Sequence, residues 1–163
     1  MIKFCQNCGT ALELRIMEGR PRAYCTACQR VQYAQLKVGA GALLERAGRL
    51  LLLRRAAAPF RNYWNLPAGY VEADESPAEA VVREVYEETG LRVVAKKLVD
   101  IYYFDDDPRG NGILIVYACV STGGTLKESH ESVTATFFAP ELVPTKLAGG
   151  GHGQAITAWQ EKH

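Results

Sequence analysis

Three glutamates stand at helical spacing in the segment 77–89. Glu84, Glu87 and Glu88 are spaced i, i+3 and i+4, so on a helix that turns about 100° per residue they gather on one side. Carboxylates at this spacing repel one another by roughly a few tenths of a kcal/mol per pair. A hard divalent cation, Mg²⁺ or Mn²⁺, would turn that repulsion into binding. A solvated acidic face is the alternative, but such faces usually interleave glutamate with lysine, and this one does not.

Four of the five cysteines form two pairs. Cys5-x-x-Cys8 and Cys25-x-x-Cys28 are separated by sixteen residues, which is the spacing of a four-cysteine zinc site. Four thiolates close the coordination shell, so the predicted Zn²⁺ is structural. Disulfides or a redox pair are the alternatives, and the odd total disfavours a disulfide framework. We expect Cys119, in an apolar run, to be a small core residue.

Capping residues set the limits of the glutamate helix. Ser76 is a suitable N-cap, Pro77 suits the first helical position and Glu79 completes a capping box. Gly90 ends the helix. The side opposite the glutamates is predicted to face the core, and its residues are Ala78, Val82, Val85 and Tyr86.

Apolar runs on both sides of this helix predict strands. They cover residues 38–44, 49–54, 93–104, 113–120 and 133–138, with an extended aromatic stretch at 62–71 and a short helix at 154–160. Strands that outnumber helices without regular alternation indicate an α+β fold. The first 34 residues are too few to fold without a staple. We therefore expect a small β-rich zinc ribbon at 1–34 and a second domain at 36–163.

Composition limits the partners. Hydrophobic residues make up 48% and charged residues 23% of the 163 residues, with a formal net charge of +1. No apolar run is long enough to span a membrane, and the first residues lack a secretory signal, so we expect a cytoplasmic protein. The balanced charge makes nucleic acid an unexpected partner, although Arg15, Arg20, Arg22 and Arg30 give the first segment some basic character.

The stretch from Gly69 to Leu91 resembles the Nudix box. It has a glycine, five residues, a glutamate, seven residues, and then Arg-Glu-apolar-x-Glu-Glu-x-Gly-apolar. Every fixed position matches, although Ala68 stands where glycine is frequent before the box. The resemblance implies an α/β/α sandwich with a mixed sheet. It also implies divalent-metal-dependent hydrolysis, by water attack on phosphorus, of the pyrophosphate in a nucleoside diphosphate linked to another group.

The resemblance also assigns roles to individual residues. Glu84, Glu87 and Glu88 correspond to the family's catalytic metal ligands, and the Gly69 backbone is placed near the metal. Arg83 corresponds to the residue that orients the carboxylates, with Glu75 as its partner behind them. The general base remains open between acids of the segment 127–134. Glu128 and Glu131 are the candidates, and Thr134 stands where a further glutamate is familiar.

The cysteine segment is similar to the zinc ribbon that precedes some Nudix domains. The short ribbon resembles a group acting on FAD or ADP-ribose, and the Pro/Trp motif of NADH pyrophosphatases is missing. NADH and nucleoside triphosphates are the alternative substrates, and an inert nucleotide- or nucleic-acid-binding module is the alternative of another class. Trp64, Tyr102 and Phe104 are predicted to contact the substrate. A homodimer is one alternative for the assembly, and His130 and His152 are expected to be surface loop residues.

Overall fold

The computed structural model describes residues 3–127 and 129–163, and the chain divides into two compact units, the first ending at Gln35 and the second covering Leu36–His163. The first unit is an antiparallel three-stranded sheet in the order β1-β2-β3. Its strands are β1 (Glu13–Met17), β2 (Arg20–Cys25) and β3 (Arg30–Gln32). The segment that precedes the longer domain is therefore β-rich, as predicted.

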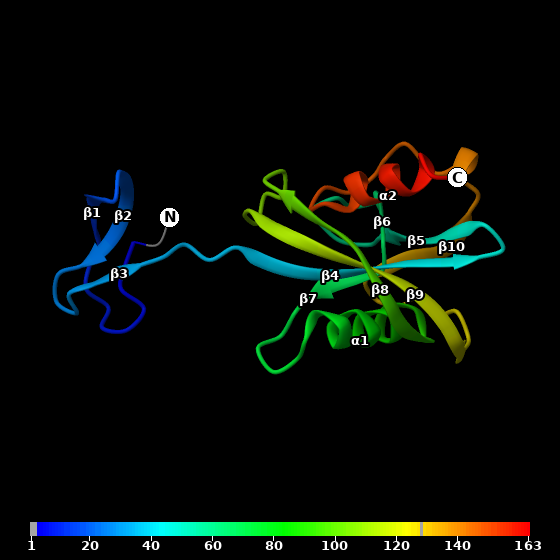
Figure 1. Ribbon diagram of the computed structural model, residues 1–163, viewed down its shortest axis with the longest axis horizontal. Coiled ribbons are helices and arrows are strands. Elements are labelled where there is room, and N and C mark those ends of the chain that lie inside the picture. Colours follow the sequence, from blue (N-terminus) through cyan, green and yellow to red (C-terminus); the bar gives the residue numbers. More distant parts are fainter. Residues whose placement is uncertain (1–2, 128) are drawn as a thin grey trace. The chain divides into compact units, whose positions relative to one another are not determined.

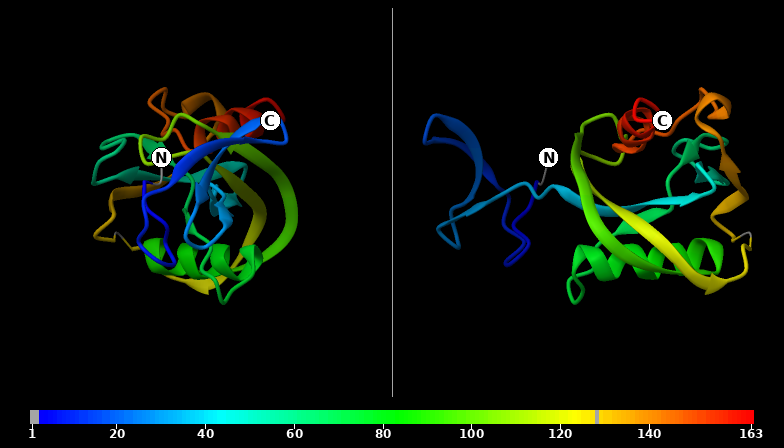
Figure 2. Two further views of the ribbon diagram at one scale, coloured as in Figure 1. Left: turned by 90° about the vertical axis from the view of Figure 1, so that its left-hand side faces the viewer. Right: turned by 45° about the vertical axis from the view of Figure 1, so that its right-hand side comes forward.

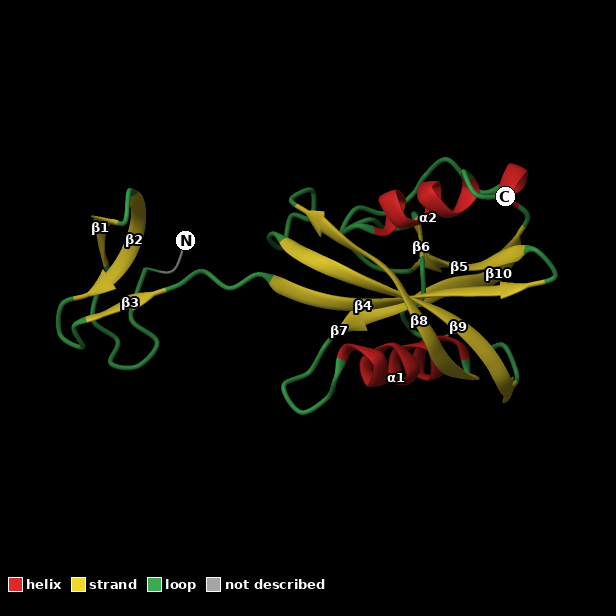
Figure 3. Cartoon of the chain, viewed as in Figure 1, coloured by secondary structure: helices red, strands yellow, loops and turns green. Residues whose placement is uncertain are grey.

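The second unit is a mixed sheet between two helices (Figures 1 and 3). Its strands are β4 (Lys37–Arg46), β5 (Arg49–Arg55), β6 (Trp64–Asn65), β7 (Ala68–Tyr70), β8 (Leu91–Phe104), β9 (Gly112–Gly124) and β10 (Ser132–Phe138). The sheet runs in the order β10-β5-β4-β9-β8, with β6 on β5 and β7 on β4. Only β4 and β9 pair in parallel among these described strands. The predicted α+β class is confirmed.

Helices α1 (Pro77–Thr89) and α2 (His152–Gln160) lie on opposite sides of this sheet, and a 3-10 turn, η1 (Pro140–Leu142), precedes α2 (Figure 2). The limits of α1 are those predicted. The Ser76 hydroxyl accepts a hydrogen bond from the Glu79 amide, the Glu79 carboxylate accepts one from the Ser76 amide, and Gly90 adopts a left-handed φ of 71°. In the described part of the chain no helix combines the length and apolar character needed to cross a bilayer.

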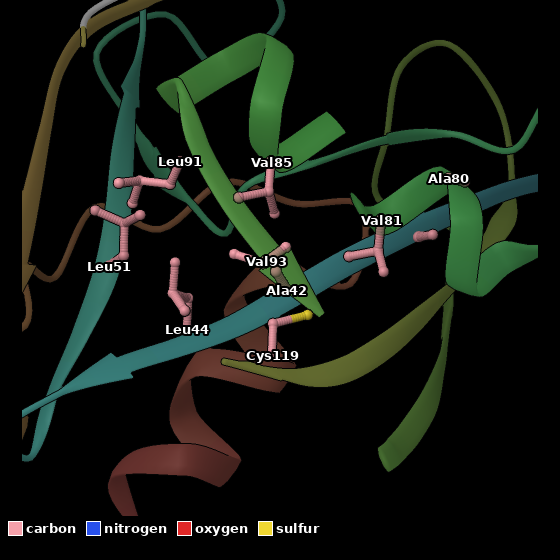
Figure 4. Close-up of a cluster of buried hydrophobic side chains, with 10 residues drawn as sticks. Ala42, Leu44, Leu51, Ala80, Val81, Val85, Leu91, Val93 and Cys119 are labelled. Carbon is pink, nitrogen blue, oxygen red and sulfur yellow. The ribbon is translucent and has the colours of Figure 1, made fainter. Parts of the chain in front are cut away.

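Two hydrophobic cores fill the layers. The first packs α1 against β4, β5, β8 and β9 (Figure 4), and the second includes Ile156 and Trp159 of α2. The predicted core side of α1 was partly wrong. Tyr86 is 54% exposed, whereas Ala80 and Val81 are fully buried. The helix is rotated from the predicted direction because it packs mainly on the side that carries Val81 and Val85, and this rotation brings Glu88 to the edge of the core.

Candidate active site

Arg83 is the centre of an ion-pair network on α1. Its Nη1 donates to Glu84 at 2.7 Å and to Glu87 at 3.1 Å. Its Nη2 and Nε bind the two oxygens of Glu75 at 2.6 and 3.0 Å, and Nη2 also donates to the Tyr70 carbonyl at 3.0 Å. The hydrogen bonds from Arg83 lower the pKa of Glu75. Arg83 therefore ties the carboxylates of α1 to the chain that leads into the helix.

The segment β7 lies against the carboxylates of α1. The Glu84 carboxylate lies so close to Gly69 that a Cβ at this position would approach its oxygens to less than 3.0 Å. The Ala68 amide donates to Glu88 Oε2 at 2.9 Å. Glycine at position 69 therefore leaves room for the Glu84 carboxylate in its observed position. The strand and the helix together fix the positions of both carboxylates.

Glu88 is a buried carboxyl group with a single protein hydrogen bond in the described part of the chain. Only 7% of the residue is exposed. Burial raises the pKa of Glu88 to about 8, and the negative charges of Glu84 and Glu131 act in the same direction. Burial likewise raises the pKa of Glu84, against the effect of Arg83. Carboxylates kept out of water and close to one another are costly unless a cation compensates them.

A cavity of about 360 Å³ opens in front of these carboxylates. Four acidic side chains line one part of it, namely Glu72, Glu84, Glu87 and Glu131. Glu88 is not among the lining residues, but its carboxylate accepts a hydrogen bond from the amide of Ala68, which is. Oxygen ligands of this kind are those that Mg²⁺ and Mn²⁺ prefer. The donor set and the uncompensated burial of Glu88 both fit a divalent cation held by Glu84, Glu87 and Glu88.

Glu131 comes to this cavity from a distant part of the sequence. It precedes β10, and its carbonyl accepts a hydrogen bond from the Ala56 amide at 2.9 Å. Its side chain is 64% exposed and lies 3.4 Å from His130 Nε2. Glu131 thus lines the same cavity as Glu84 and Glu87. Glu128 lies outside the described residues.

The three aromatic residues predicted to bind substrate have different places. Phe104 lines the cavity and is 6% exposed. Trp64 packs edge-on against Phe138 with ring centroids 4.8 Å apart. Tyr102 packs against the second core and borders a smaller, separate hollow beside α2. Trp64 and Tyr102 are thus partly buried residues packed against the second core, and neither lines the main cavity.

Two residues to which the sequence analysis gave no role in the site line the same cavity. Arg55 comes from the end of β5. His152 was expected on a surface loop, which was wrong, because it is the first residue of α2 and its Nδ1 is buried. Burial, followed by the charges of Arg55 and Arg109, lowers the pKa of His152 to about 3. The only sequence signal for this region is the glycine run at 149–151, directly before the helix.

The four paired cysteines form a second candidate metal site, within the first unit. Their sulfur atoms all lie within 4.8 Å of one another. Cys5 and Cys25 are buried, whereas Cys8 is exposed. The Cys28 amide donates to the Cys25 sulfur at 3.3 Å. Four sulfur ligands with a supporting backbone amide fit a closed, structural zinc site. Cys119 is buried in the core of the other unit, as expected.

Comparison with known proteins decides the family. A model described as the NUDIX domain matches residues 35–159, and one described as Nudix N-terminal matches residues 3–34. The chain belongs to the Nudix hydrolase family. Both parts of the predicted resemblance, the hydrolase domain and the ribbon, are thereby confirmed.

Individual relatives agree with this assignment. The ADP-ribose pyrophosphatase of Methanocaldococcus jannaschii is 40% identical over 117 residues, which cover 71% of this chain and 69% of that protein. The NAD-capped RNA hydrolase NudC of Stutzerimonas stutzeri is 37% identical over 91 residues, 56% of this chain but only 32% of that protein. A crystal structure of a Nudix hydrolase from Nitrosomonas europaea has a TM-score of 0.85 at 29% identity, covering 99% of this chain and 92% of that one. This Nudix hydrolase is thus an enzyme for pyrophosphate bonds in small nucleotides.

Proposed function

We propose that this Nudix hydrolase cleaves the diphosphate of ADP-ribose, with Mg²⁺ or Mn²⁺ held by Glu84, Glu87 and Glu88. The observation that carries the metal proposal is the burial of Glu88 beside two further carboxylates, at the edge of a cavity large enough for a nucleotide ligand. When bound, the cation supplies charge neutralisation for the diphosphate and acidifies a water molecule. The remaining tasks fall to residues of the chain.

The reaction consumes one water and breaks one P–O bond of the P–O–P bridge. ADP-ribose gives AMP and ribose 5-phosphate. Glu131 is the residue that we propose to take the proton from the attacking water, because its exposed carboxylate lines the cavity from a segment far from α1 in the sequence. Arg83 keeps the carboxylates of α1 in place through its hydrogen bonds. A neutral His152 at the start of α2 adds no charge to the site.

ADP-ribose is placed first because the relative named for it matches over most of both chains. FAD shares the adenosine diphosphate half and is the second substrate of the same class. A hydrolase acting on an NAD-type diphosphate is the other candidate, favoured by the similarity to NudC. That match covers only the smaller part of the NudC protein, so it supports the reaction more than the substrate.

A substrate panel tests the proposal. The purified enzyme is assayed with ADP-ribose, FAD, NADH, CoA and nucleoside triphosphates, each with Mg²⁺ and with Mn²⁺. We expect the highest kcat/KM for ADP-ribose or FAD, since this ratio measures discrimination between competing substrates. A clear preference for a nucleoside triphosphate would contradict the proposed substrate. A preference for NADH would change the substrate but keep the proposed catalytic residues.

We also propose that Cys5, Cys8, Cys25 and Cys28 bind one structural Zn²⁺. The support is that the four sulfur atoms all lie within 4.8 Å of one another and that the unit they belong to is small. A three-stranded sheet of this size has too small a core to be stable without a cross-link or a metal.

A further inference from the structure

The arginines on the cavity wall and next to it are paired with carboxylates, with one exception among the described residues. Arg109 forms an ion pair with Asp107 at 2.7 Å, and Arg83, next to the cavity, is shared among three carboxylates. Arg55 also lines the cavity. Within residues 3–127 and 129–163, no carboxylate lies within ion-pair distance of Arg55. It is therefore the one arginine on the described cavity wall whose charge is available to an anionic ligand.

The Arg55 side chain is held in place by the backbone around it. Its Nε donates to the Pro59 carbonyl at 3.2 Å. Its own amide donates to the Tyr63 carbonyl at 3.0 Å, and its carbonyl accepts from the Asn62 amide at 2.9 Å. The loop 56–63 thus anchors the guanidinium at one edge and leaves the two terminal amino groups as donors. A guanidinium held in this way is suited to bidentate binding of a phosphate.

Arg55 stands between the acidic part of the cavity and the start of α2. In the sheet it pairs with Ser132, next to Glu131. Burial raises the pKa of Glu88 and lowers that of His152, and the charge of Arg55 acts on both groups, against the first shift and with the second. The His152 Nδ1 is buried and has no hydrogen-bond partner in the described part of the chain. A polar group left in this state suggests that a ligand completes this end of the cavity.

A diphosphate carries negative charge on both phosphoryl groups. The glutamates attract cations and repel phosphate, so one phosphoryl group can be held there only through metal ions. We propose that Arg55 binds the other phosphoryl group directly and so positions the diphosphate across the cavity. This inference rests on the proposed function, because it requires a diphosphate in this cavity. Arg55 is then a substrate-binding residue, and His152 closes the cavity beside it.

The test separates phosphate binding from metal binding. Methylenediphosphonate, which has no ribose or base and cannot be hydrolysed at its bridge, is titrated into the whole protein in Mg²⁺ by calorimetry. The variants are Arg55→Gln, Arg55→Lys and, as control, Arg49→Gln, which removes the same charge from the exposed start of the same strand. Mn²⁺ alone is titrated into each protein as the second measurement.

We expect Arg55→Gln to weaken methylenediphosphonate binding roughly ten- to hundredfold, the effect of losing charge-assisted hydrogen bonds. Arg55→Lys should weaken methylenediphosphonate binding by about a third to a half as much on a logarithmic scale. Lysine keeps the positive charge but cannot donate two parallel hydrogen bonds to one phosphoryl group. Arg49→Gln should bind like wild type. Mn²⁺ should bind Arg55→Gln as tightly as wild type or more tightly, because a nearby positive charge has been removed. A merely structural role for Arg55 would weaken both ligands.

Equal binding of methylenediphosphonate by wild type and Arg55→Gln would overturn the inference, and so would a loss of Mn²⁺ affinity that matches the loss of the diphosphonate. A wild-type enzyme that hydrolyses the substrate panel but binds no methylenediphosphonate would overturn it as well. Failure of the proposed function has a different signature, namely a wild type that binds the diphosphonate through Arg55 but hydrolyses none of the nucleoside diphosphate derivatives.

Discussion

The Glu84 carboxylate lies against the α-carbon of Gly69, so closely that the position has no room for a β-carbon. Gly69→Ala should therefore displace this carboxylate while leaving the core intact, because the colliding atoms are the far end of a flexible side chain. We expect kcat to fall about tenfold or more and the melting temperature to change by only a few degrees. Gly153→Ala, whose Cβ would make ordinary contacts, is the control and should keep its activity.

Glu88 should support catalysis as a metal ligand and at the same time lower the stability of the folded protein when it is ionised. We expect Glu88→Gln and Glu84→Gln to lower kcat/KM by roughly two to three orders of magnitude, or ~3–4 kcal/mol, because each removes a metal ligand. Both variants should fold. Wild-type turnover by both of them, measured on ADP-ribose in Mg²⁺ and in Mn²⁺, would show that the active site has been assigned to the wrong residues.

The pH dependence of stability provides a test that does not use activity. The folded protein binds the Glu88 proton more tightly than the unfolded chain, with a pKa of about 8 against the ordinary glutamate value of 4.5. The resulting stabilisation is fully present below about 4.5 and is lost as pH rises to about 8. Without Mg²⁺ or Mn²⁺, Glu88→Gln should therefore be more stable than wild type at pH 8, on the order of a few kcal/mol, and similar to it near pH 4.5.

Urea unfolding across this pH range measures the effect. Glu87→Gln is the matched control, since its side chain is 57% exposed and should not change the pH dependence. A Glu88→Gln curve parallel to wild type from pH 5 to 8 would show that Glu88 is ionised throughout. Saturating Mn²⁺ should remove the advantage of Glu88→Gln, because the cation favours the ionised wild-type carboxylate.

The extent of α1 and the spacing of its glutamates could be predicted from the sequence because local chemistry determines them. Ser76, Glu79 and Gly90 fix the ends of the helix through bonds within one turn. The spacing of Glu84 and Glu88 then follows from the helix itself. The predicted strands match most of the sheet for the same reason, since each run is long and apolar.

The direction in which α1 faces the sheet could not be read in this way. A helical wheel distinguishes an apolar side from an acidic one, but the tertiary packing decides that Val81 is buried and Tyr86 is exposed. The cavity is also beyond local reasoning, because Arg55, Glu131 and His152 come from separate elements. Nothing in the residues next to Trp64 distinguishes a core aromatic from one that stacks on a substrate.

The ribbon should contain one tightly bound zinc per chain, detectable by elemental analysis. Cys25→Ser, at a fully buried position, should lose the metal and the hydrogen-exchange protection of the first unit. Cys119→Ala should keep both, since Cys119 belongs to the core of the other unit. Zinc-free protein with four reduced thiols and a protected ribbon would contradict a structural role for the metal.

Glu131 is the proposed general base. Glu131→Gln should lower kcat by about 10²–10⁴-fold while Mn²⁺ binding changes much less than in Glu84→Gln, because Glu131 is an exposed residue that reaches the cavity from outside α1. The pH profile of kcat distinguishes a base from a metal ligand. If Glu131 takes the proton, its removal should abolish the acidic limb of the profile, and raising the pH should recover part of the rate as hydroxide replaces the assisted water. A metal ligand would show neither effect, because its loss lowers the rate at every pH and is compensated by higher Mn²⁺ concentration. Wild-type kcat in Glu131→Gln at all pH values would remove Glu131 from the mechanism and leave proton transfer to another acid, with Glu128 the first to be tested by the same substitution.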